Sequence, residues 1–390
     1  MSAVAAPVAV AADRTRLLGW GGVVLGALAA FVAVPPLIVR APAVPLVLGA
    51  LAVLLGLAAL RARQRKLGTG AIAAGVLGAV LGTAATGAEV GELETVFVWS
   101  ALAGAMLRFA TPLILAALGG IISERSGVVN IGLEGMMLMG AFWAVYGSDK
   151  LGGWLPGLLV AMLAGAALAL VHAAFSIGLR AEQIVSGTAI NLLAAGITGY
   201  VFLATYGSEG TPNDVARVPS YDLPVLGGQS LLTILALLGV VAMSVYLFRT
   251  PSGLRLRAVG EKPRAAETVG ISVIRTRYMG VVASGVLAAL GGAFLSLSLV
   301  GSFNQNMTAG RGFIALAAVI FGKWRPGGAL AAALLFGFSS ALAQRLPEFS
   351  PSAATLFQAL PYVLTLIAVA GVIGRSRPPA SLGIPYRRGG

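Results

Sequence analysis

Apolar runs of membrane-crossing length recur from one end of the chain to the other, and they constrain its fold more than any other feature. A helix of about 17–25 apolar residues crosses roughly 30 Å of hydrocarbon. The chain is 58% hydrophobic and only 11% charged, so it has too few polar side chains to cover a soluble domain of 390 residues. The sequence predicts an all-α polytopic integral membrane protein with about 10–12 transmembrane helices, some of them broken or re-entrant.

We divide the chain into two predicted parts: an accessory block of about three helices, residues 1–94, and a core, residues 97–386. The first apolar run is too long for a typical signal-peptide core, so we expect a retained helix. The predicted spans are 17–39, 44–60, 68–88, 97–122, 128–147, 155–178, 184–206, 230–248, 278–300, 312–322, 327–344 and 355–374.

The basic residues are distributed unevenly between the two sides of the membrane. With the N-terminus inside, 21 of the 27 Lys and Arg residues fall in inner segments and 5 in outer ones, and Arg108 lies within a span. The positive-inside rule then predicts that both termini are cytoplasmic. The net charge of +13 is therefore explained by topology, and we expect no nucleic-acid partner.

Asn130 and Glu134 are polar residues near the start of the predicted span 128–147. Four residues apart, they would share one face of a helix. A carboxylate at mid-bilayer costs about 3 kcal/mol, so it is expected to face a protein interior or a watery cavity. Glycines around the pair predict a broken or re-entrant helix; they are Gly127, Gly132 and Gly135.

Two interpretations of Glu134 stay open at this point. It lines a translocation path or gate, or it forms a buried interhelical pair with Ser123, Arg125 or a neighbouring helix.

Two further polar clusters are candidates for a substrate pathway. The segment "GSFNQNMTAGRGF" offers amide and guanidinium donors to a polar solute, unless it is simply a solvated outer loop. The segment "RAEQIVSGTAINLL" carries polar groups into a span, where hydrogen bonding between helices is the alternative. The candidates in these two segments are Asn304, Asn306, Arg311, Gln183 and Asn191.

Several kinds of chemistry are excluded or unsupported. The chain has no cysteine and one histidine, His172, so we expect no metal site and assign His172 to packing. Arg108 is expected to snorkel or to find a partner within the bundle. There is no phosphate-binding G-x-x-x-x-G-K-[ST] sequence and no catalytic constellation, so a pump built on this chain would take its energy from another chain.

The largest inner loop, residues 249–277, carries a local charge of +5. Proline favours a first helical position, which predicts a short helix beginning at Pro263. This loop either lies on anionic lipid or docks into a partner's groove. The residues singled out are Arg257, Pro263, Arg264, Ala265, Ala266, Glu267 and Gly270.

Three segments together resemble the membrane permeases of bacterial ABC importers for simple sugars, nucleosides and branched-chain amino acids. They are "RSGVVNIGLEGMMLMGAF", "GLRLRAVGEKPRAAETVGI" and "MTAGRGFIALAAVIFGKWRPGGALAAALLFG". The resemblance is closest to the nucleoside-type permeases and covers roughly residues 97–386.

The resemblance implies a non-enzymatic importer subunit in the bacterial cytoplasmic membrane that takes up nucleosides or nucleobases. It implies partner ABC ATPase subunits that use the ATP and dock on the loop around residues 263–270, with no cofactor bound by this chain. It further implies an extracytoplasmic substrate-binding lipoprotein and a second permease chain, either a related sister or a second copy. The block 1–94 departs from this family.

Three other functions remain as alternatives to this prediction. Simple sugars or branched-chain amino acids are the alternative substrates of an ABC permease. An ion-coupled secondary transporter, with Glu134 as the coupling carboxylate, is the main rival, and a purely structural membrane protein is the third.

Overall fold

A computed structural model of the chain describes residues 6–34, 37–87, 98–207, 210–212, 215–349 and 377–387. The chain forms two compact units, one of Met1–Leu102 with Ser339–Arg375 and one of Ala103–Phe338 with Ser376–Gly390. The predicted boundary near residues 94–97 lies outside the described residues and stays a prediction.

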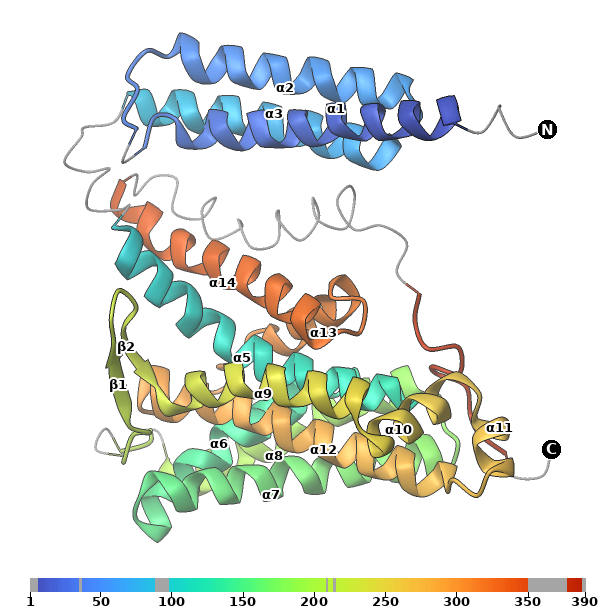
Figure 1. The fold of residues 1–390 in the computed structure, drawn as a ribbon. Helices are drawn as coiled ribbons and strands as arrows, with labels where there is room; N and C mark the ends of the chain where they lie inside the picture. Colours follow the sequence, from blue (N-terminus) through green and yellow to red (C-terminus); the bar gives the residue numbers. More distant parts are fainter. Residues whose placement is uncertain are drawn as a thin grey trace. The chain divides into compact units, whose positions relative to one another are not determined.

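The first unit contains a bundle of three helices, α1 (Ala6–Phe31), α2 (Ala43–Arg61) and α3 (Arg65–Thr86), drawn in blue in Figure 1. Its backbones approach closely: a Cβ atom at Gly78 would lie 2.0 Å from the carbonyl oxygen of Gly26. Small residues permit such contacts between membrane helices. The guanidinium of Arg40 donates hydrogen bonds to the carbonyl oxygens of Ala85 and Thr86, 3.2 Å away in each case, and so satisfies the end of α3.

Helices long and apolar enough to cross a membrane number eight among the described residues, which confirms a polytopic all-α protein. They are Ala43–Arg61, Arg65–Thr86, Trp99–Arg125, Trp154–Gly178, Gln183–Tyr206, Leu231–Arg249, Val273–Val300 and Pro326–Arg345. Three other predicted spans correspond to shorter or more polar helices. The last, 355–374, lies outside the described part of the chain, and the side of the membrane on which each terminus lies stays a prediction.

At the centre of the second unit lies α6 (Leu133–Leu151), packed against α7 (Trp154–Ala173), α8 (Gln183–Tyr206) and α12 (Val273–Ala293) (Figure 1). Its side chains are buried on all sides, with Met136, Met137 and Phe142 completely inaccessible. A helix that is apolar all round is expected in the interior of a bundle, and α6 occupies that place.

Some local structure differs from an uninterrupted set of α-helices. Helices α7 and α12 continue as π-helical turns, η1 (Ala174–Gly178) and η2 (Phe294–Val300). A small antiparallel hairpin, β1 (Ser220–Leu223) and β2 (Gly227–Ser230), pairs Ser220 with Ser230 and precedes α9 (Leu231–Arg249). The sequence did not predict these strands.

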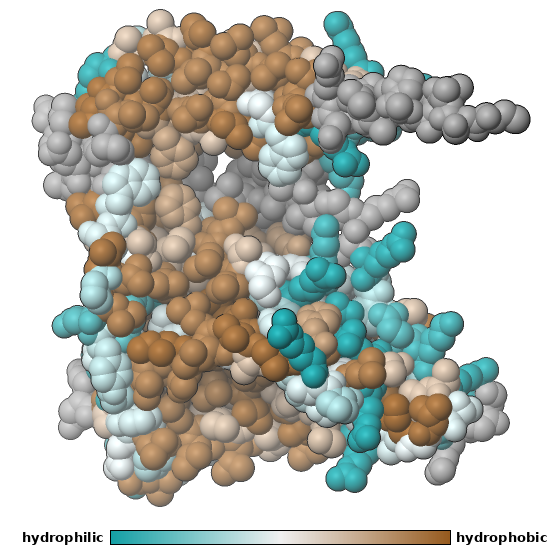
Figure 2. Space-filling view, viewed as in Figure 1, coloured by the Kyte–Doolittle hydropathy of each residue, from teal (hydrophilic) through white to brown (hydrophobic). Residues whose placement is uncertain are grey.

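The remaining helices are α5 (Trp99–Arg125), α10 (Pro251–Glu261), α11 (Pro263–Thr268), α13 (Arg311–Phe321) and α14 (Pro326–Phe349). Helix α11 begins at the predicted proline. Helix α10 was missed, although the hydroxyl of Thr250 accepts a hydrogen bond from the N–H of Gly253 and caps it. In Figure 2 hydrophilic residues, in teal, gather around α10 and α11, whereas the helices beside them present an apolar surface.

Candidate functional site

Residues 127–132, which join α5 to α6, form an interrupted segment that is not helical. It begins at Gly127, whose φ of +93° favours glycine, and ends where α6 starts at Leu133. Four of its six residues are buried. Backbone polar groups at membrane depth must be satisfied by protein or by water in a cavity, so the partners of this segment define how it is held.

Side chains of α7 and α8 form hydrogen bonds with both backbone polar groups of Val129, its N–H and its carbonyl oxygen. Its N–H donates to Oε1 of Gln183 at 2.7 Å, and its carbonyl oxygen lies 3.1 Å from Nε2 of His172. Because a carbonyl only accepts, Nε2 carries the proton, and Nδ1 of the neutral ring then accepts from the Ser186 hydroxyl at 3.0 Å. His172 is buried as expected, but it braces the backbone as well as packing.

Asn191 of α8 holds the next part of the segment. Its Nδ2 donates to the carbonyl oxygen of Ile131 at 3.1 Å, and its Oδ1 accepts from the N–H of Gly135 at 2.8 Å. A single amide therefore bridges the end of the interrupted segment and the first turn of α6. Gln183 and Asn191 thus form hydrogen bonds between elements, the alternative considered from the sequence, and their contact with a solute stays a prediction.

Asn130 and Glu134 do not share a helical face, so that expectation was wrong. Asn130 precedes α6, and its Nδ2 donates to the Ser284 hydroxyl at 2.9 Å. The Oδ1 of this completely buried side chain has no partner among the described residues. Glu134 lies in the first turn of α6 and reaches a different element.

The carboxylate of Glu134 caps α13. Its Oε1 accepts from the N–H of Gly310 at 2.8 Å, and its Oε2 accepts from the N–H of Gly312 at 2.6 Å. The carboxylate thus serves the unsatisfied N–H groups at the N-terminus of α13 while lying in the first turn of α6, and negative charge is favoured at both places. Of the partners considered from the sequence, the neighbouring helix is the one observed.

The loop before α13 leaves its amides accessible: Asn304 and Asn306 are both exposed. The guanidinium of Arg311 donates to the carbonyl oxygens of Met307 and Thr308, at 2.9 and 3.1 Å. Arg311 therefore shapes its own loop. The contact of Asn304, Asn306 and Arg311 with a solute stays a prediction.

Helices α10 and α11 form an exposed pair that leads into α12. Arg264 and Ala265 are exposed, whereas Ala266 is buried against Val259 and Val273. Arg257 of α10 lies over the ring of Phe248 at 5.0 Å. One face of helix α11 is therefore exposed, and the opposite face packs against α10 and α12.

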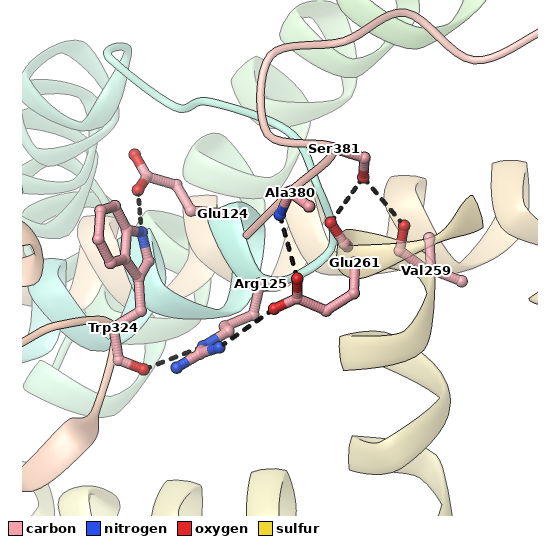
Figure 3. A network of polar contacts seen from close by, with 8 residues as sticks. Glu124, Arg125, Val259, Glu261, Trp324, Ala380 and Ser381 are labelled. Carbon is pink, nitrogen blue, oxygen red and sulfur yellow. Dashed lines mark hydrogen bonds and ion pairs between the residues drawn. The ribbon is translucent and has the colours of Figure 1, made fainter. Parts of the chain in front are cut away.

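A second polar network, drawn in Figure 3, connects the end of α5 to α10. The indole Nε1 of Trp324 donates to the buried carboxylate of Glu124. Arg125 donates to the carbonyl oxygen of Trp324 at 3.1 Å and lies 3.9 Å from the carboxylate of Glu261. Arg125 is thereby occupied away from Glu134. The sequence did not predict a role for Glu124, although the adjacent charged residues Glu124 and Arg125 at the end of an apolar run are a visible signal.

Comparison with known proteins matches residues 102–369 to the family described as "Branched-chain amino acid transport system / permease component". The chain belongs to this family. The permease is 44% identical to the guanosine ABC transporter permease protein NupQ of Bacillus subtilis (strain 168), over 76% of this chain and 99% of the relative. It is 39% identical to the nucleoside ABC transporter permease protein NupC of Lactococcus lactis subsp. cremoris, over 72% of this chain and 95% of the relative.

No solved structure matches the permease significantly. The family match begins at residue 102, so the three-helix block α1–α3 lies outside it. The permease is a multi-pass integral protein of the bacterial cytoplasmic membrane, and the family consists of transport components rather than catalysts.

Proposed function

We propose that this permease is the membrane subunit of an ATP-driven importer of nucleosides or nucleobases. The observation that carries the substrate class is the 44% identity to a guanosine permease over 99% of that protein's length. The geometry is compatible with a gated path: the interrupted segment and the 11-residue helix α13 are held by side chains, and side-chain hydrogen bonds are able to rearrange.

Energy enters through partner ATPase subunits that dock on α10 and α11. The exposed, basic character of this pair supports docking, since charge complementarity fixes partner and register. In this arrangement α10, α11 and both termini are cytoplasmic. A substrate-binding protein delivers the solute at the opposite face, where Asn304 and Asn306 lie exposed, and a second permease chain completes the path.

Reconstitution tests the proposal. Proteoliposomes would hold the permease with candidate ATPase and sister-permease subunits, with binding protein outside, ATP inside, and labelled nucleosides or ribose as solutes. We expect nucleoside uptake that requires ATP and stops with vanadate. Uptake of ribose but not of nucleosides would show that the substrate is a simple sugar. Uptake by the permease without its partners, abolished by a protonophore, would identify a secondary transporter.

Docking is tested by a matched pair of charge reversals. Arg264→Glu changes the outward surface of α11, whereas Arg180→Glu makes the same change at an exposed residue between η1 and α8. Reversal of a charge at a docking surface costs several kcal/mol, so we expect Arg264→Glu to lower ATPase co-purification by roughly tenfold or more. Equal retention of the ATPase by both variants would place docking elsewhere.

A further inference from the structure

Residues 377–387, near the end of the chain, form a C-terminal strap against α10, α11 and α12. The hydroxyl of Ser381 donates to the carbonyl oxygens of Gly260 and Val259, at 2.7 and 3.2 Å, and the N–H of Ser381 donates to Gly260 at 2.9 Å. The N–H of Ala380 reaches the carboxylate of Glu261 at 3.2 Å. Figure 3 shows this part of the strap lying over the end of α10.

The strap also holds α11 and α12. The hydroxyl of Tyr386 donates to the carboxylate of Glu267 in α11, and the Tyr386 ring packs beside Val259, Ala266 and Val273. Arg277 of α12 is 1% exposed. Its guanidinium donates to the carbonyl oxygen of Ile384 at 3.0 Å, so a buried cation of α12 depends on the strap for a partner.

The strap reaches the interrupted segment as well. The N–H of Gly383 donates to the carbonyl oxygen of Gly127 at 3.3 Å. A Cβ atom at Gly127 would lie 2.9 Å from both Nη2 of Arg277 and Oγ of Ser381. At Gly260 a Cβ atom would lie 2.1 Å from the carbonyl oxygen of Arg125. The end of α10, the strap and the start of the interrupted segment are therefore in direct contact.

From these contacts we infer that the C-terminal strap is a coupling element, which makes α10, α11 and residues 125–127 move together when the partner ATPase moves α11. This inference rests on the proposed function. Its physical basis is that close-packed, hydrogen-bonded elements transmit displacement as a unit. Ser381 and Tyr386 are its positioning residues, because their contacts run to α10, α11 and the interrupted segment.

The test uses variants that remove one hydroxyl each, Ser381→Ala and Tyr386→Phe. Their matched controls, Ser220→Ala and Tyr221→Phe, make the same changes at exposed residues of β1. In the reconstituted importer we expect basal ATP hydrolysis to persist, while solute transported per ATP falls roughly threefold to tenfold, the scale of one hydrogen bond. An unchanged ratio, or a parallel loss of hydrolysis and uptake, would overturn the inference.

A second measurement does not depend on transport. Hydrogen–deuterium exchange on the purified permease should show faster exchange in residues 127–135 for Ser381→Ala and Tyr386→Phe, but not for the two β1 controls. Faster exchange confined to the strap itself would overturn the inference even where the importer works. If the unmodified protein shows no ATP-driven uptake, but the two strap variants show the expected faster exchange in residues 127–135, only the proposed function would be overturned.

Discussion

The carboxylate of Glu134 accepts a 2.6 Å hydrogen bond from the N–H of Gly312, which lies 178 positions further along the chain. A Cβ atom at position 312 would lie 2.5 Å from the Cα atom of Glu134, so the two backbones are nearly in contact. The first turns of α6 and α13 are thereby fastened to each other by one buried charge.

Replacing Glu134 is therefore expected to loosen α13. Charge-assisted hydrogen bonds contribute about 1.5–3 kcal/mol each. Because Glu134→Ala removes two of them, it should lower the free energy of unfolding by roughly 3–6 kcal/mol, with Glu134→Gln intermediate because its amide retains one acceptor. Thermal unfolding of the purified permease measures the change.

Glu182→Ala is the matched control. Its carboxylate also accepts from two backbone N–H groups, those of Ile184 and Val185, but it is exposed. Loss of such a surface cap costs about 1 kcal/mol. An equal loss of stability in both variants would contradict the role of burial.

The bridging role of the Asn191 amide in the interrupted segment can be tested by substitution. Asn191→Asp keeps the acceptor for the N–H of Gly135 but brings a carboxylate oxygen against the carbonyl of Ile131, where the amide donated. Because the partly buried carbonyl of Ile131 then has no donor, we expect a cost of about 1–3 kcal/mol and faster hydrogen exchange in residues 129–135. Asn304→Asp, at an exposed position, should leave both unchanged; a similar response in the two variants would rule out the bridging role.

Asn306 separates backbone from side-chain effects in the loop before α13. Its φ is +56°, a region that glycine enters freely and β-branched residues resist. Asn306→Gly should keep the loop and remove the amide, whereas Asn306→Val should strain the loop by about 1–3 kcal/mol. If the amide meets solute, uptake by Asn306→Gly falls without loss of thermal stability; unchanged uptake would remove Asn306 from the path.

Gly78 tests the packing of the three-helix block. A methyl group there meets the carbonyl oxygen of Gly26, so Gly78→Ala should destabilise the block by about 1–3 kcal/mol. Gly196→Ala is the control, since a Cβ atom in the middle of α8 meets nothing within 4 Å and alanine favours helix. Protease sensitivity of residues 6–87 reports the result, and equal sensitivity of both variants would refute close packing at Gly78.

The sequence was informative wherever local chemistry decides the structure. The apolar runs indicated the eight membrane-length helices of the described residues. Pro263 indicated the start of α11, and the glycines around Asn130 indicated the break before α6. Partners were a different matter. That Glu134 meets Gly312, or Gln183 meets Val129, depends on contacts between distant segments, and neither hydropathy nor spacing encodes them. The strap was not predicted either, because "SLGIPY" has no apolar period and its contacts are also with distant segments.

The interrupted segment changes what a point mutation does. In a regular helix the hydrogen bonds run between backbone groups, so side chains are exchanged without altering them. At Val129 and Ile131 the backbone hydrogen bonds are instead made with the side chains of His172, Gln183 and Asn191. A substitution at one of these positions of α7 or α8 therefore removes a backbone hydrogen bond about 40 to 60 positions earlier in the chain. The conformation of the interrupted segment is thus more sensitive to substitution than that of a helix, because it depends on side chains that lie outside the segment.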